Sequence, residues 1–294
     1  MKMNKKYRWL SVRANTKEYL NPAYYDRILK SYRFNSKSDL ELLRDRIEHA
    51  PSARKFIEFG PGTGRATKIA IDYAKHMERI TLVDLSKRML ARCRQKFSES
   101  KTLYYVASDT IDFLLAAKGR YDFAFSLWSF SHSTHQTLSR LGIKNGSQKI
   151  RLAVNKFLTN NLQPGGSFFL MHFDSLSEEQ MISIKQRRHA FPIFKDSTRQ
   201  SPSKLLIDDI LKCLKARGVI TFTCKRYKGD PLEFHSIDEA LEYYLNFHME
   251  SHFNTSGSID KIIEELSADI EKYRNRDGVI RITPGCFIYN IVRR

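Results

Sequence analysis

Short apolar runs separated by longer amphipathic or polar stretches dominate the chain between residues 52 and 172. Continuous apolar runs of this length are typical of buried strands, and the first of them is followed by helical periodicity from about Arg65 to His76. The expected strands are residues 56–59, 80–84, 103–107 and 121–126, followed by a fifth strand that a turn at residues 162–166 leads into and that extends to about residue 171. The pattern predicts an α/β domain over this part of the chain.

Further elements are expected on both sides of this region. Helical periodicity extends from Tyr24 to Ile47, and another helix is expected from about Lys204 to Arg217. A final pair of strands is expected at residues 219–227 and 279–292. About fifty residues separate these two strands, where a hairpin needs only a few, and residues 236–253 and 258–273 have helical patterns. The sequence therefore predicts a helical N-terminal segment and a helical insertion between the last two strands.

Three glycines at alternate positions, Gly60, Gly62 and Gly64, follow the first expected strand, and Glu58 lies two residues ahead of them. Glycine adopts backbone angles closed to other residues and lets a ligand approach the main chain closely. The dinucleotide-binding fingerprint is G-x-G-x-x-G, whereas the spacing here is G-x-G-x-G. The turn predicts a nucleoside-binding site of another kind, with an ordinary strand-to-helix turn as the alternative.

Two carboxylates follow the next two expected strands. Asp84 ends the second strand, where a carboxylate can accept hydrogen bonds from both hydroxyls of a ribose. Asp109 comes directly after the third strand and Ser108. Either residue could instead cap the helix that follows it, because Asp is a favoured N-cap, and capping does not exclude ligand binding.

These features resemble, in order and spacing, the motifs of the class I methyltransferases that depend on S-adenosylmethionine (SAM). The resemblance rests on the acid-x-G-x-G-x-G turn, Asp84, Asp109, the strand that ends at Ser126, and the turn Leu162-Gln163-Pro164-Gly165-Gly166. It covers about residues 52–172 and extends more loosely to the final strand pair. It implies a Rossmann-like, seven-stranded and mostly parallel sheet with an antiparallel last strand.

The resemblance also implies how the cofactor is held. The glycine turn would lie against the amino acid end of SAM, Asp84 would accept from the ribose, and Asp109 would accept from the adenine amino group. Glu58, Leu85, Thr110 and Ser126 border these positions and are expected cofactor contacts as well. The product would be S-adenosyl-L-homocysteine (SAH).

A catalytic group is harder to assign. The methyl group of SAM sits on a cationic sulfur, so the reaction is an in-line displacement in which alignment matters most. A base helps when the acceptor is a hydroxyl or a protonated amine, and His is the usual choice near neutral pH. The resemblance places residues 128–135, expected as a loop, beside the methyl group. His132 is the first candidate for base or positioner and His135 the second, although His132 could merely pack, because proximity alone can suffice.

The expected domain organisation is an N-terminal helical cover at residues 1–50 and the methyltransferase domain at 51–294, with residues 175–202 and 231–278 as lid or cap insertions. The substrate-pocket candidates are Tyr24, Tyr25, Trp128, His172, Tyr243, Tyr244 and His248. His248 and His252 share a helix face, but H-x-E-x-H is not the H-E-x-x-H zinc motif and no third ligand is evident, so no metal is expected.

Composition and charge indicate where the protein is located and what it could bind. No run approaches the ~20 apolar residues that cross a bilayer, and the basic N-terminus lacks a signal-peptide core. The four cysteines are scattered without C-x-x-C spacing, which disfavours a disulfide framework and predicts a reducing, cytoplasmic location. The net charge of +18 fits nucleic acid, an anionic membrane surface, an acidic substrate or simply a basic solvated surface. Oligomeric state is not indicated.

The sequence after the fourth strand bears on the acceptor. It reads Ser126-Leu127-Trp128-Ser129, without the Asn/Asp-Pro-Pro-aromatic motif typical of enzymes that methylate exocyclic amino groups of bases, or the Pro-Cys typical of pyrimidine C5 methylation. We therefore expect a SAM-dependent methyltransferase acting on a small-molecule N, O or C acceptor. The alternatives are an RNA (tRNA or rRNA) or protein methyltransferase, which the charge favours, and a SAM-binding regulatory protein without catalysis.

Overall fold

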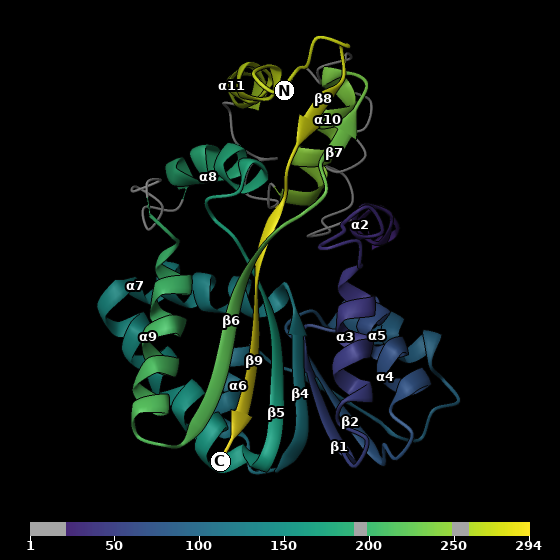
Figure 1. Ribbon diagram of the computed structural model, residues 1–294, viewed down its shortest axis with the longest axis vertical. Helices are drawn as coiled ribbons and strands as arrows, with labels where there is room; N and C mark the ends of the chain where they lie inside the picture. The colour runs from purple at the N-terminus through teal and green to yellow at the C-terminus, as the bar shows by residue number, and fades with distance from the viewer. Residues whose placement is uncertain (1–21, 191–198, 249–258) are drawn as a thin grey trace. The chain divides into compact units, whose positions relative to one another are not determined.

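The computed structural model describes residues 22–190, 199–248 and 259–294 (Figure 1). The chain divides into two compact units. The sheet unit consists of Lys37–Asp174, Gln200–Tyr227 and Cys286–Arg294, and the small unit consists of Met1–Ser36, Ser175–Arg199 and Lys228–Gly285. Each unit is assembled from segments that lie far apart in the sequence.

The sheet unit contains one seven-stranded sheet in the order β3-β2-β1-β4-β5-β9-β6. Its strands are β1 (Lys55–Phe59), β2 (Arg79–Asp84), β3 (Leu103–Ala107), β4 (Tyr121–Leu127), β5 (Leu162–Phe173), β6 (Ile220–Lys228) and β9 (Gly285–Arg293). The strands from β3 to β5 are parallel, and β9 runs antiparallel to β5 and lies between β5 and β6. The expected Rossmann-like sheet with an antiparallel last strand is confirmed.

Helices cover both faces of this sheet, with α3, α4 and α5 on one side and α6, α7 and α9 on the other (Figure 1). Their bounds are α3 (Asp39–Glu48), α4 (Arg65–Tyr73), α5 (Lys87–Lys96), α6 (Thr110–Ala116), α7 (Ser129–Lys156) and α9 (Pro202–Ala216). Helix α7 is kinked at Gly142, where φ is 76°, and continues into a short π-helical turn, η1 (Phe157–Asn161). The doubly covered sheet explains why its strands are continuous apolar runs.

The core of the sheet unit is aromatic. Phe59, at the end of β1, packs edge-to-face against Phe130, Phe157 and Phe168, with ring centroids 5.4 to 6.1 Å apart. All four rings are buried. The cluster joins β1 and β5 to the helix that follows β4, and so it holds the strand ends that carry the candidate site.

The small unit is formed by helices around a two-stranded hairpin. Its elements are α2 (Pro22–Leu29), α8 (Glu178–Ala190), β7 (Leu232–Phe234), α10 (Ile237–Tyr243), η3 (Tyr244–His248), α11 (Ile259–Glu271) and β8 (Ile280–Ile282). Strand β7 pairs antiparallel with β8, and the Gly229 amide donates to the Pro284 carbonyl at 2.9 Å. The helical insertion between the last two strands of the large sheet is thus closed by backbone hydrogen bonds at its base.

Three expectations need correction. The helical pattern from Tyr24 to Ile47 forms two helices, because the chain turns between them and Asn35 and Ser36 adopt positive φ angles of 52° and 62°. The last strand, expected at 279–292, is two strands, with β8 ending before Thr283 and Pro284. The helix expected over 236–253 changes at Tyr244 to a π-helical turn. Residues 249–258, with His252, fall outside the described part of the chain.

The expected lid and cap segments contribute to the small unit. Helix α2, helix α8 and the insertion belong to it, whereas α3, expected in the N-terminal cover, belongs to the sheet unit. That these segments cover the substrate side stays a prediction.

Candidate functional site

The turn between β1 and α4 carries the three glycines, and all of them have positive φ, at 75°, 53° and 78°. A Cβ at Gly60 would lie 2.0 Å from the Ser129 Oγ, and one at Gly64 would lie 2.6 Å from the Phe97 ring. A Cβ at Gly62 would meet nothing within 4 Å. Two of the glycines are therefore required by packing within the chain, and only Gly62 leaves open space beside the main chain.

Glu58 is buried in β1 and accepts a hydrogen bond from the Thr67 hydroxyl of α4 at 2.6 Å. Burial raises the pKa of its carboxyl to about 8, and the bond from Thr67 opposes this shift. In the described structure Glu58 holds α4 against the strand that leads into the glycine turn. Direct contact with a cofactor stays a prediction.

Asp84 ends β2 and faces the glycine turn. Its Oδ2 accepts from the Gly62 amide at 3.2 Å and its Oδ1 from the Ser86 amide at 2.8 Å. Burial raises the pKa of this carboxyl, and the two amide bonds oppose the shift. Ser86, and not Asp84, caps helix α5, so the capping alternative does not explain Asp84. The neighbouring Leu85 is 64% exposed, and its contact with a cofactor stays a prediction.

Asp109 follows β3 and is the N-cap of α6. Its Oδ1 accepts from the Ile111 and Asp112 amides at 2.8 and 3.1 Å. Both capping bonds end on Oδ1, and Oδ2 takes no part in the cap. The cap is therefore compatible with ligand binding through Oδ2. Thr110, the first residue of the helix, is buried.

Ser126 lies near the end of β4, and Trp128 directly follows the strand. The Ser126 hydroxyl donates to the Phe59 carbonyl at 2.8 Å and accepts from the Phe130 amide at 3.1 Å. Residues 129–135 were expected to form a loop, but they form the first turns of α7, which starts directly after Trp128. The helix starts this early because Trp128 adopts φ 70° and turns the chain within one residue.

His132 and His135 lie on these first turns and are half-buried. His132 is three residues beyond Ser129 and so lies on the same face of α7 as the residue that touches Gly60. Its ring packs edge-to-face against Phe173 at 5.5 Å, and the Trp128 ring lies 4.8 Å from Phe173. The structure thus brings His132 and Trp128 together around one aromatic ring, and their roles stay predictions.

The other pocket candidates belong to other elements, and their roles stay predictions. His172 is buried in β5, where its Nδ1 contacts the Phe173 carbonyl at 2.8 Å and its Nε2 faces the Ser203 hydroxyl at 3.5 Å. Burial lowers its pKa to about 4. Tyr243 and Tyr244 are buried in the small unit around Glu179. Tyr24 and Tyr25 fall in α2, and His248 falls in η3.

Sequence reasoning missed two residues at this edge of the sheet, Asp39 and Arg65. Asp39 is fully buried at the start of α3 and pairs with Arg65, the first residue of α4. The only local signal was the pattern Ser38-x-x-Glu41, which is typical of a helix start.

Within the described residues, no helix has the length and apolar character needed to span a membrane, and no three His, Cys, Asp or Glu side chains come together as a metal site. The described cysteines form no disulfide.

Comparison with known proteins gives one family match and several solved structures of similar fold. Residues 56–142 match the family model of the methyltransferase domain. Two similar solved structures are the YcgJ protein from Bacillus subtilis (12% identity, TM-score 0.51) and a candidate methyltransferase from Bacillus halodurans (14%, 0.50). Each alignment covers 86% of this chain, with 99% of the YcgJ chain and 97% of the other. No curated protein gives a significant match.

At these identities the structural likeness concerns the fold, and the family match concerns the segment from β1 into α7. Together with the strand order and the turn after β1, they show a methyltransferase domain over residues 56–142 within a Rossmann-like fold. A methyltransferase domain agrees with the SAM-dependent enzyme expected from the sequence, with SAM as the cofactor and SAH as the product.

Proposed function

We propose that this methyltransferase transfers the methyl group of SAM to an N, O or C atom of a small molecule, with Asp84 and Asp109 as the cofactor-binding carboxylates. The observation that carries the cofactor assignment is the pairing of Asp84 with the amide of Gly62, the one glycine of the turn that has open space beside it. This pairing puts a carboxylate directly beside a main chain that a ligand can approach.

The residues present fit the polar groups of SAM. Strands β1, β2 and β3 are neighbours and parallel, so Gly62, Asp84 and Asp109 lie along one edge of the sheet. Ribose hydroxyls and an adenine amino group are donors, and carboxylates accept from donors. Helix α4 begins at Gly64 without a side-chain cap, and its amides suit the carboxylate of the amino acid end.

When bound, SAM supplies a methyl group activated by the positive charge of its sulfur. The chain has to bind the cofactor, orient the acceptor and, for a hydroxyl or ammonium acceptor, remove a proton. His132 is the proposed proton acceptor or positioner, because it lies one helical turn beyond Ser129, which contacts the glycine turn. Trp128 and Phe173 would then form the apolar wall beside it.

The small-molecule assignment is supported by the end of β4. The Ser126 hydroxyl forms hydrogen bonds within the protein, to the Phe59 carbonyl and from the Phe130 amide, and Trp128 directly follows the strand. No Asn/Asp-Pro-Pro-aromatic segment for an exocyclic base amine occupies this position.

Titration calorimetry with SAM and SAH tests the proposal. We expect both to bind, and we expect Asp84→Ala to weaken SAM binding by about 1 to 3 kcal/mol, the typical loss of a hydrogen bond to a charged group. Asp72→Ala on the outer surface of α4 is the matched control and should bind SAM normally, since Asp72 pairs only with Lys68 among the contacts seen. Unchanged affinity in Asp84→Ala would refute the ribose assignment.

Turnover is a separate test. Purified protein should transfer label from methyl-labelled SAM to a component of a small-metabolite extract, and His132→Ala should lower the rate while SAM affinity is kept. Binding without transfer to any extract would instead favour the SAM-binding regulator.

An RNA substrate is the second candidate, because helix α5 carries five cationic side chains and no carboxylate, in the sequence KRMLARCRQK. Phosphate contacts make binding strongly salt-dependent. Labelled methyl transfer to total RNA, measured at low and high salt, separates the two candidates. Salt-sensitive transfer that is lost in Lys87→Glu combined with Arg94→Glu would replace the small-molecule proposal.

A further inference from the structure

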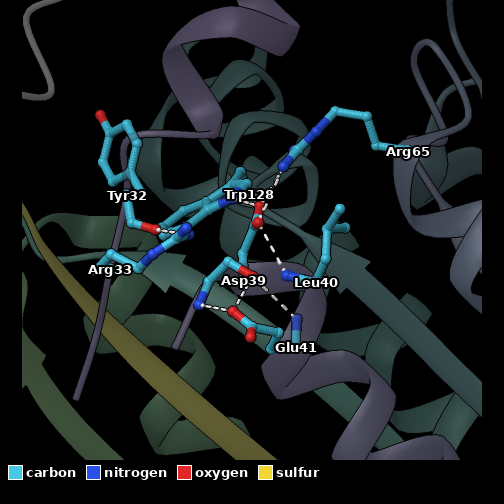
Figure 2. A network of polar contacts seen from close by, with 8 residues as sticks. Tyr32, Arg33, Asp39, Leu40, Glu41, Arg65 and Trp128 are labelled. Carbon is cyan, nitrogen blue, oxygen red and sulfur yellow. Dashed lines mark hydrogen bonds and ion pairs between the residues drawn. The ribbon is translucent and has the colours of Figure 1, made fainter. Parts of the chain in front are cut away.

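The buried carboxylate of Asp39 lies at the centre of a polar network in the sheet unit (Figure 2). It accepts from the Trp128 Nε1 at 3.0 Å (Oδ2), from Arg65 Nη1 at 3.2 Å (Oδ2), from Arg65 Nη2 at 3.0 Å (Oδ1) and from the Leu40 amide at 2.9 Å (Oδ1). A carboxylate accepts about four hydrogen bonds, so both oxygens are fully used. The network joins three segments of the chain.

The position of Asp39 is set locally by a capping box. The Glu41 amide donates to the Ser38 hydroxyl at 3.2 Å, and the Ser38 amide donates to Glu41 Oε2 at 2.8 Å. These bonds hold the first turn of α3, in which Asp39 is the first helical residue. Asp39 is therefore presented from a rigid element and not from a loop.

The two side-chain partners of Asp39, Arg65 and Trp128, lie at the starts of helices α4 and α7. Arg65 directly follows Gly64 and begins α4, and its fork binds both oxygens of the carboxylate. Trp128 separates β4 from α7. Since β1 and β4 are neighbouring strands and Gly60 touches Ser129, the glycine turn and the start of α7 already meet on one side.

Trp128 is also held in an unfavourable backbone conformation. Its φ of 70° lies in the region that bulky residues avoid, and such a residue persists only where its surroundings hold it. The indole bond to Asp39 and the backbone bond from Trp128 to the Met171 carbonyl at 3.2 Å are two such restraints. Strained residues of this kind cluster at functional sites.

We propose that Asp39 is a positioning residue for cofactor binding: it ties the start of α4 to Trp128 and thereby holds the glycine turn and the start of α7 in the arrangement that binds SAM. The proposal rests on the proposed function, because it takes SAM as the ligand of this edge. It predicts that breaking the network weakens SAM binding in protein that is still folded. Preorganised sites lose affinity when the residues behind the contact shell are removed.

The experiment uses the full chain with Trp9→Phe, which leaves Trp128 as the single tryptophan of the two in the sequence. In this background Asp39→Asn keeps one carbonyl acceptor but removes the charge that faces Arg65. We expect SAM affinity, measured by calorimetry, to fall about ten-fold, which is a typical effect of losing a charged hydrogen bond. We also expect a rise in KM for SAM with a smaller change in kcat, and a changed emission spectrum of Trp128.

Asp122→Asn is the matched control. The Asp122 carboxylate accepts from the Arg54 and Lys55 amides at 2.9 and 2.8 Å, at the opposite end of β1 from the glycine turn. It is also an aspartate that links two segments remote in the sequence, so it should lower thermal stability without changing SAM affinity or Trp128 emission. Trp128→Phe is the second variant, because it removes the indole donor, with part of the ring volume, and keeps a ring against Phe173.

The outcomes separate the two proposals. Failure of the parent protein to bind SAM refutes the proposed function and, with it, this inference. If the parent binds SAM and Asp39→Asn binds it equally well, Asp39 has a structural role only and the inference alone is wrong. If Asp39→Asn does not fold, Trp128→Phe decides: several-fold weaker SAM binding supports the inference, and unchanged binding overturns it.

Discussion

At the scale of single residues, Glu58 shows how burial couples protonation to stability. In the unfolded chain its carboxyl has the ordinary pKa of 4.5, whereas burial raises the folded value to about 8. Between these two pH values the folded protein binds a proton that the unfolded chain has lost, so the free energy of unfolding falls as the pH rises from about 4.5 to 8. Above about pH 8 the carboxyl is ionised in both states, and the folded protein carries the full free-energy cost of a buried carboxylate.

Glu58→Gln should remove this dependence, because the amide stays neutral and can still accept from Thr67. The folded and unfolded pKa values, about 8 and 4.5, differ by roughly 3.5 units, and one unit corresponds to about 1.4 kcal/mol. We therefore expect the variant to be more stable than the parent by on the order of 5 kcal/mol at about pH 9, and nearly equal at about pH 4. Urea denaturation at the two pH values measures the difference. An equal change at both would show that packing, and not protonation, sets the effect.

At the scale of elements, the glycine turn combines packing and ligand access in five residues. Gly62 has a φ of 53° and open space around a Cβ, so Gly62→Ala should cost about 1 kcal/mol of stability from the backbone alone and weaken SAM binding further by filling the approach. Gly218, after α9, has a φ of 73° and equal space. Gly218→Ala should thus show the same loss of stability with unchanged SAM affinity, measured by thermal unfolding and calorimetry.

A substitution at Gly60 tests the packing role of the glycine turn. A Cβ there would overlap Ser129, so Gly60→Ala should destabilise the protein by several kcal/mol, as is typical of overpacking with backbone strain. A stable Gly60→Ala protein would contradict the close contact between the glycine turn and α7.

At the scale of the whole molecule, the small unit depends on contacts between distant segments. The hydroxyls of Tyr32 and Tyr243 both donate to the carboxylate of Glu179, and the two hydroxyls lie 2.6 Å apart. Burial, followed by the negative charge of Glu179, raises the pKa of both tyrosines, so they remain donors. The cluster links α8, α10 and the residues after α2 within one unit.

Tyr243→Phe should therefore loosen the small unit by about 1 to 3 kcal/mol, the cost of a lost bond to a buried charge, while SAM affinity stays unchanged. Hydrogen exchange should speed up in residues 228–248 and 259–285 and remain slow in β1. Tyr104→Phe on the exposed side of β3 is the control and should change neither. A matching loss of SAM affinity in Tyr243→Phe would show that the two units do not act independently.

The sequence by itself determined the elements whose signal is local. The positions of β1 to β5 followed from apolar runs, which a sheet covered on both faces requires. The sequence also predicted the turn at Gly60 to Gly64 and the carboxylates Asp84 and Asp109 at strand ends. These features can be recognised because the residues that define them are adjacent in the sequence. The resemblance to class I methyltransferases then implied a mostly parallel sheet with an antiparallel last strand.

The tertiary structure decided what depends on partners far apart in the chain. Helix α7 starts directly after Trp128, where a loop was expected, and the indole of Trp128 is held by Asp39, 89 residues earlier. The last predicted strand divides at Thr283 and Pro284, because β8 pairs with β7 while β9 enters the large sheet beside β5. Local periodicity contains none of this information. A hydrogen bond or strand pair between remote residues forms only when the packing of the whole unit brings both partners together and excludes water from them.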